Sequence, residues 1–124
     1  MKTILALAGV LCFSVAALAQ DAEILDATNL DAIREKAGTE AVVEGLVSNI
    51  GTTKDGGITF INIGLEKKQG FVAVVFQKSY GAFGDGFDKY RDQKVRVSGP
   101  IELYRGEQPQ IILNSPEQIT IVTD

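Results

Sequence analysis

The sequence contains no histidine in its 124 residues. Histidine is the side chain that most often moves protons near neutral pH, and it is also the commonest metal ligand. Its absence argues against Ser-His-Asp triads, histidine-ligated zinc enzymes and most hydrolase mechanisms. We therefore expect a binding protein rather than an enzyme, with no cofactor and no metal site.

Cysteine is nearly absent, since Cys12 is the only one and lies in an apolar stretch near the N-terminus. Lys2, the apolar run Ile4–Val15 and the small residues of Ala17–Ala19 form the pattern of a secretory signal peptide, which predicts cleavage after Ala19. The run is shorter than the ~20 apolar residues of a membrane-spanning helix. We expect a secreted or periplasmic protein without a membrane span in the mature chain. Because no cysteine would remain, its fold must depend on its core alone.

A basic excess is also missing, because 12 Lys and Arg residues stand against 16 Asp and Glu residues, for a formal net charge of −4. Residues 21–40 hold six acids and two bases, so residues 41–124 are close to neutral. Neutralisation of phosphates supplies most non-specific affinity for duplex nucleic acid. The charge balance therefore argues against tight binding of nucleic acid.

The composition is that of a small globular domain, with 45% hydrophobic and 23% charged residues. This balance excludes a disordered or low-complexity chain. In the acidic part, Thr28 or Asn29 is a candidate helix N-cap, and Gly38 follows the apolar positions at helical spacing. We expect a signal peptide, an acidic lead segment with a short helix, and a β domain, at residues 1–19, 20–40 and 41–124.

From Ala41 the chain alternates with a period of two, which predicts a strand of about ten residues. Later runs rich in β-branched and aromatic residues predict further strands. Aromatic residues at spacings of three and four predict a short helix within residues 79–91. Gly99 and Pro100 predict a bend, because proline donates no ladder hydrogen bond. The further expected strands are 58–63, 71–77, 94–104, 109–114 and 119–122.

This order predicts an all-β fold, namely a five-stranded Greek-key barrel of the OB-fold (oligonucleotide/oligosaccharide-binding) type. The helix would lie between the third and fourth strands, and the long first strand would serve both halves of the sheet. The loop at residues 51–57 lies where OB-fold domains usually meet ligands. Its glycines suit a flexible ligand-binding loop and an ordinary turn equally well.

Residues 41–122 resemble the anticodon-binding type of nucleic-acid OB-fold family, which includes domains of aspartyl-tRNA synthetase and of the exonuclease VII large subunit. The C-terminal part also resembles the hairpin of small exported bacterial OB-fold proteins. The resemblance implies a barrel that binds single-stranded nucleic acid. The segments that carry it are Val43–Asn49, Gly57–Ile63, Phe71–Phe76, Val95–Gly99, Tyr104–Gly106 and Pro109–Leu113.

The resemblance places Phe60 where the synthetases carry an aromatic side chain that stacks on a base. Ala73 stands where those enzymes carry a base-reading glutamine, and Thr53 stands beside Lys54 where they carry arginine. The resemblance therefore does not imply specific reading of tRNA. The candidate ligand-binding residues are Phe60, Lys54, Asn62, Lys67, Lys68, Phe71, Lys78, Tyr104 and Arg105, with Phe76 as a further ring of the stacking surface.

Two functional hypotheses remain open from the sequence. In the first, the barrel binds a single-stranded nucleic acid, or a similar extended polymer such as an oligosaccharide, across its second and third strands by stacking and lysine contacts. In the second, it is a protein-interaction or stress-related adaptor of the cell envelope with no nucleic-acid ligand. Only one of the neighbours Phe60 and Ile61 can face the core, so the exposure of Phe60 bears on the choice.

Overall fold

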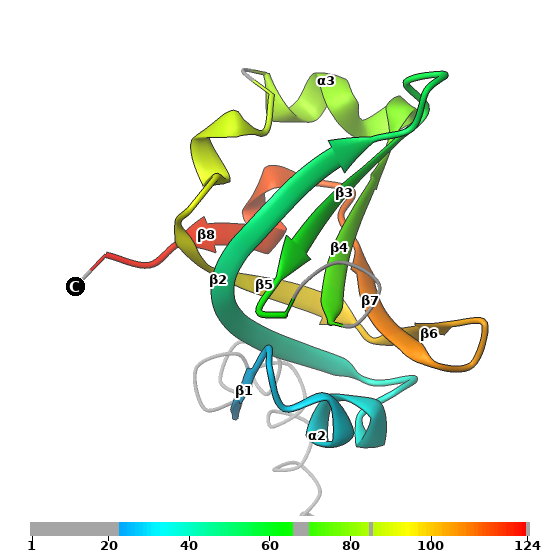
Figure 1. Cartoon of the computed structure of the whole chain (residues 1–124), viewed down its shortest axis with the longest axis vertical. Coiled ribbons are helices and arrows are strands. Elements are labelled where there is room, and N and C mark those ends of the chain that lie inside the picture. The colour runs from blue at the N-terminus through cyan, green and yellow to red at the C-terminus, as the bar shows by residue number, and fades with distance from the viewer. Residues whose placement is uncertain (1–22, 66–69, 85, 124) are drawn as a thin grey trace, which may run out of the picture.

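A computed structural model of the chain describes residues 23–65, 70–84 and 86–123 (Figure 1). The expected signal peptide with Cys12, and the candidate residues Lys67 and Lys68, lie outside these ranges. In the part of the chain that is described, no helix has the length and apolar character needed to cross a membrane.

Strands and short helices follow one another along the described chain. Their order is β1 (Ile24–Asp26), α2 (Leu30–Glu35), β2 (Glu40–Thr52), β3 (Ile58–Ile63), β4 (Phe71–Phe76), η1 (Gln77–Ser79), α3 (Tyr80–Phe83), η2 (Asp88–Tyr90), β5 (Lys94–Pro100), β6 (Glu102–Tyr104), β7 (Gln108–Ile112), η3 (Pro116–Gln118) and β8 (Ile119–Ile121).

Strand β2 is the long curved strand of the sheet (Figure 1). Its first part, Glu40–Leu46, pairs with β5, and its second part, from Val47 to Thr52, pairs with β3. A register shift between Val47 and Asn49 separates the two parts. The prediction that the first strand serves both halves of the sheet is therefore confirmed.

The sheet has the order β6-β7-β4-β3-β2-β5-β8, with β1 added to β2. Only Ile101 separates β5 from β6, so one stretch of chain pairs with β2 at its start and with β7 at its end. The sheet therefore coils back on itself as in a partly open OB-fold barrel. The predicted bend is present at Gly99, whose φ of 148° is one that glycine adopts readily.

The described chain has eight strands, and the expected number of five was wrong. The bend divides the expected fourth strand into β5 and β6. Strand β8 lies within the expected strand 119–122. Strand β1 was not expected, because its three residues are too few to show a periodic pattern.

The core lies inside this coiled sheet and is built from alternate residues of its strands, because successive side chains point to opposite faces. The lead segment contributes to the same core through Leu25, Ala27 and Ile33. The fully buried side chains of the barrel strands include Val43, Ile61, Ile63, Phe71, Ala73, Val75, Val95, Val97 and Ile111.

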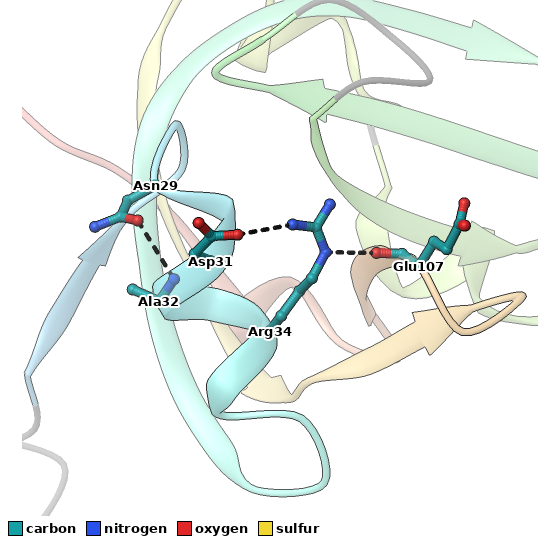
Figure 2. Close-up of polar contacts among 5 residues, drawn as sticks. All are labelled: Asn29, Asp31, Ala32, Arg34 and Glu107. Carbon is teal, nitrogen blue, oxygen red and sulfur yellow. Dashed lines mark hydrogen bonds and ion pairs between the residues drawn. The ribbon is translucent and has the colours of Figure 1, made fainter.

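Helix α2 is capped at its start by Asn29 and is joined to the β6–β7 turn by one arginine (Figure 2). The Asn29 side chain accepts a hydrogen bond from the Ala32 N–H. Of the two predicted N-cap candidates, Asn29 is therefore the cap. Arg34 pairs with Asp31 and donates from Nε to the Glu107 carbonyl oxygen at 2.9 Å. The lead segment thereby contacts the turn between β6 and β7.

The connection from β4 to β5 consists of three short helical pieces, η1, α3 and η2, rather than the single helix that we expected. Gly84 and Gly86 adopt φ values of 61° and 88°, which interrupt a right-handed helix. Phe83 and Tyr90 are nevertheless buried in the core, and the Phe87 ring packs between Tyr80 and Phe83.

Candidate functional site

A groove with a volume of about 680 Å³ lies on the outer face of β3, β4, β7 and β6, next to the end of β2. Its lining is mainly apolar, amide-bearing or hydroxyl-bearing. The lining residues are Asn49, Gly51, Thr52, Thr53, Ile58, Phe60, Asn62, Val72, Val74, Phe76, Glu102, Tyr104, Gln108, Gln110 and Ile112.

Strand pairing arranges this lining in rows that cross the sheet. One row is polar except at its centre and runs through Asn49, Asn62, Val72, Gln110 and Glu102. We call it the polar row. The next row is apolar and consists of Gly51, Phe60, Val74 and Ile112. The pair Ile58 and Phe76 lies beyond the apolar row. The pair Tyr104 and Gln108 lies beyond the polar row, on the side away from the apolar row.

Phe60 is partly exposed on the groove floor, whereas its neighbour Ile61 is fully buried. Since only one of these two neighbours can face the core, the burial of Ile61 leaves the Phe60 side chain accessible to a ligand. Phe76 is also partly exposed and lines the groove. These rings therefore offer apolar surface on which a planar ligand could stack.

Tyr104 adds a second aromatic surface at the far side of the groove, and half of it is exposed. The Arg105 guanidinium carbon lies 5.3 Å from the centroid of the Tyr104 ring, within the range of a cation–π contact. The hairpin turn therefore places an aromatic ring and a positive charge together.

Phe71 was expected to contact a ligand, but its side chain is fully buried in the core, so this expectation is corrected. Ala73 faces the core as well, and the side chains of β4 that reach the groove are Val72, Val74 and Phe76. All six residues of β4 are apolar, so the sequence showed no alternation from which to assign its faces. The base-reading position that the resemblance assigned to Ala73 therefore does not lie on this surface.

The predicted cations that the structure describes, Lys54, Lys78 and Arg105, do not line the groove. Lys54 is exposed in the turn after β2, and Lys78 is exposed in η1, where the Gln77 N–H bonds to the Gly57 carbonyl oxygen. Among the residues described as lining the groove, Glu102 is the only charged one. The floor of the groove thus has little attraction for phosphate, and positive charge is available at its ends.

Asn62 was predicted from the sequence as a candidate, whereas Glu102, Gln108 and Gln110 were not. The spacing of two between Gln108 and Gln110 is the signal that could have placed them on one face of a strand. The Gln108 side chain donates to the Gly70 carbonyl oxygen at 3.0 Å, so part of its amide is already used within the protein.

The turn at residues 53–57 borders the groove through Thr53 and is held by several hydrogen bonds. The Asp55 carboxylate accepts from the Thr53 hydroxyl at 2.7 Å and from the Gly57 N–H at 2.9 Å. These bonds lower the pKa of Asp55, and the bond from Thr53 has the larger effect. The Tyr80 hydroxyl donates to the Gly56 carbonyl oxygen at 3.0 Å. These bonds favour the ordinary turn over the flexible loop, the two alternatives that its glycines left open.

Comparisons with known proteins identify the fold. No protein-family model matches the sequence, and no curated protein matches it. Similar solved structures include OBody AM3L15 bound to hen egg-white lysozyme, with 18% identity and a TM-score of 0.52 over 79% of this chain and 95% of that chain.

Two aspartyl-tRNA synthetases are also similar. The enzyme from Leishmania major Friedlin shows 12% identity and a TM-score of 0.52 over 83% of this chain. The enzyme from Entamoeba histolytica shows 12% identity and a TM-score of 0.51 over 80% of this chain. The chain spans only 21% and 22% of these enzymes. At such identities the likeness shows an OB-type fold alone.

Proposed function

We propose that this chain is a non-catalytic binding module that holds a single-stranded nucleic acid across the groove on β3, β4, β7 and β6. The observation that carries the proposal is Phe60, an aromatic ring that stays partly exposed on the groove floor while both of its core-facing neighbours in β3 are buried. Stacking of a base on an aromatic side chain contributes ~1–3 kcal/mol and tolerates any base.

The arrangement of rings and cations fits an extended polymer. Phe60 and Tyr104 belong to strands separated by three strand spacings, or roughly 14 Å, which leaves room for more than one base between them. Lys54 and Lys78 lie beyond the Phe60 side of the groove, and Arg105 lies beside Tyr104. In this proposal the bases lie on the groove floor, and the cations at the two ends contact phosphates. The likeness to aspartyl-tRNA synthetases, whose names include tRNA, supports nucleic acid as the ligand class.

Fluorescence anisotropy with a labelled single-stranded oligonucleotide tests the proposal. Phe60→Leu keeps the apolar bulk but removes the ring, so we expect its Kd to rise by about fivefold or more. Leu46→Ala is the control, because Leu46 is 55% exposed and does not line the groove. An absence of binding at low salt, or equal affinity of wild type and Phe60→Leu, would contradict the proposal. Displacement of the oligonucleotide by an uncharged oligosaccharide would indicate a sugar ligand instead.

A second candidate is an extended segment of a partner protein in the cell envelope. The observation that favours it is the mainly apolar groove, in which the described lining residues include no lysine or arginine. The similar OBody is bound to lysozyme, so a protein ligand is compatible with this fold. A stoichiometric partner captured from an envelope extract, retained after nuclease treatment and lost in Phe60→Leu, would support this candidate over nucleic acid.

We also propose that the protein is exported, on the basis of the N-terminal pattern of Lys2, an apolar run and Ala17–Ala19. Expression of the full chain in a bacterial host and mass measurement of the product test this proposal. The expected mature protein begins at Gln20 and lies outside the cytoplasm. An uncleaved chain confined to the cytoplasm would contradict it.

A further inference from the structure

The polar row across the groove floor contains an amide that stacking does not explain. Asn62 is only 6% exposed, and no hydrogen bond from another described residue reaches its side chain. In the described part of the chain, every side-chain nitrogen or oxygen that is sealed from solvent has a partner. Asn62 lines the groove, so a polar ligand atom there can reach its amide.

Two further polar groups continue the row. Gln110 lies two strands away from Asn62, and Glu102 pairs directly with Gln110. Within the described residues neither side chain makes a hydrogen bond to the protein, and both line the groove. Directly paired residues on a sheet have Cβ atoms about 5 Å apart. Asn62, Gln110 and Glu102 of the polar row therefore present two amides and a carboxylate to one ligand, between the Phe60 ring and the Tyr104 ring.

The carboxylate of Glu102 restricts which part of a nucleic acid can lie here. A phosphate beside it would be repelled, so the sugar–phosphate backbone is expected to pass at the ends of the groove, where the cations lie. The polar row would then meet the edges of bases whose faces stack on the aromatic rings. Amide side chains both donate and accept hydrogen bonds, whereas a carboxylate only accepts them.

We infer that the polar row reads base edges, and that Glu102 makes the groove prefer bases with an exocyclic amino group. The inference rests on the proposed function. Cytosine presents an N4 amino group that donates to a carboxylate, whereas thymine presents the O4 acceptor at the same position. Thymine O4 and the Glu102 carboxylate would therefore both be hydrogen-bond acceptors, and no hydrogen bond would form between them. Stacking on Phe60 alone would bind both bases.

Anisotropy titrations with labelled oligo(dC) and oligo(dT) of about 12 nucleotides, within the usual site size of an OB fold, test the inference. We expect the wild type to bind oligo(dC) about fivefold more tightly than oligo(dT). In Glu102→Gln the ratio should fall close to one, because an amide can also donate to thymine O4. Glu107→Gln is the matched control, since Glu107 is exposed in the neighbouring turn and does not line the groove, and it should keep the wild-type ratio.

Thermal melting of each variant shows whether the fold is retained, and Glu102→Asp, which keeps the carboxylate, should retain a preference for oligo(dC). Equal binding of both oligonucleotides by the wild type would overturn base-edge reading and leave the stacking groove intact. An undiminished preference in Glu102→Gln would overturn the role of Glu102. Failure of the wild type to bind either oligonucleotide would contradict the proposed function itself.

Discussion

At Gly45, β2 passes so close to the lead segment that no side chain fits. A Cβ atom there would lie 2.6 Å from Ala27 Cβ and 2.9 Å from Ile63 Cγ2. Both neighbours are buried in the core, so the strain cannot be relieved by moving an exposed side chain. We expect Gly45→Ala to lower the free energy of unfolding by about 1–3 kcal/mol, as other overpacked cores do.

Urea denaturation measures this effect. Gly81 provides the control, because it lies in α3 and a Cβ there would have no atom within 4 Å. Gly81→Ala should leave stability unchanged or raise it slightly, since alanine favours a helix. If Gly45→Ala were as stable as Gly81→Ala, the close packing of the lead segment on β2 would be wrong.

Glu44 gives the fold a pH dependence. Its carboxylate accepts from Arg96 Nε at 2.7 Å and lies 3.1 Å from Lys94 Nζ. The hydrogen bond from Arg96, followed by that from Lys94, lowers the pKa of Glu44. Because the pKa is lower in the folded state than in the unfolded state, these contacts stabilise the fold above the ordinary glutamate pKa. The stabilisation is lost as the pH falls through the folded-state pKa.

We therefore expect Glu44→Gln to lower the free energy of unfolding at neutral pH by about 0.5–1 kcal/mol, because the ion pairs are partly exposed to solvent. The difference from wild type should shrink as the pH falls below the ordinary range of a glutamate. Denaturation curves over a series of pH values measure it. A difference that stays constant at acid pH would contradict the assigned role of the charge.

Among the elements, α2 supports the hairpin turn that carries Tyr104 and Arg105. Its Arg34 reaches the Glu107 carbonyl oxygen (Figure 2), and that turn is otherwise closed by backbone bonds from Gly106 to Leu103 and from Glu107 to Tyr104. Arg34→Met removes the side-chain donors but retains the apolar stem.

We expect Arg34→Met to lower stability by about 1 kcal/mol and to accelerate amide exchange at Gly106 and Glu107. Hydrogen exchange followed by NMR measures both amides. Arg91→Met is the control, because Arg91 pairs with Asp88 in η2, in another part of the fold, and should leave exchange in the hairpin unchanged. Unchanged exchange in Arg34→Met would show that the turn does not depend on α2.

The sequence predicted an element well where polar and apolar residues alternate. In β5, Lys94, Arg96 and Ser98 alternate with the buried Val95 and Val97, so both the strand and its inner face could be predicted. Strand β4 is apolar throughout because the groove floor is itself apolar there, so its two faces could not be distinguished and Phe71 was misassigned. The aromatic spacing within residues 79–91 predicted helix but not its interruption at Gly84 and Gly86. Strand β1 has only three residues, too few for a period to be seen.

The groove shows a second limit of sequence reasoning. Phe60 could be assigned by alternation and resemblance, but the polar row depends on the parallel pairing of β4 with β7 and on the pairing of β7 with β6. Val72 and Gln110 are paired although they lie far apart in the sequence. Their juxtaposition, and hence the position of Glu102 at the end of the row, follows from the topology of the sheet rather than from any local pattern.

For the molecule as a whole, charge should influence binding only moderately. Three described cations lie around the groove, namely Lys54, Lys78 and Arg105, while the protein carries a net charge of −4. If each of the three neutralises one phosphate, the logarithm of the association constant should fall with the logarithm of salt concentration with a slope of about −2. Lys67 and Lys68 would steepen the slope to about −3.5 if they also take part.

Anisotropy titrations at several salt concentrations measure this slope, and Lys54→Gln should reduce it by about 0.7. Lys89→Gln is the control, since Lys89 lies over the Tyr90 ring in η2 and outside the groove lining. A slope near zero would mean that the ligand is not a polyanion. An equal change in both variants would mean that the end of the groove near Lys54 does not contact phosphate.

A backbone-amide chemical-shift titration of the ¹⁵N-labelled protein with a single-stranded oligonucleotide tests the central claim most directly, because it locates the contact surface without a substitution. The account predicts that the largest shifts lie in the groove strands, at residues such as Phe60, Val74, Gln110 and Tyr104. Shifts concentrated on the paired strands β2 and β5 around Leu46 and Arg96, which do not line the groove, or an unchanged spectrum, would contradict it.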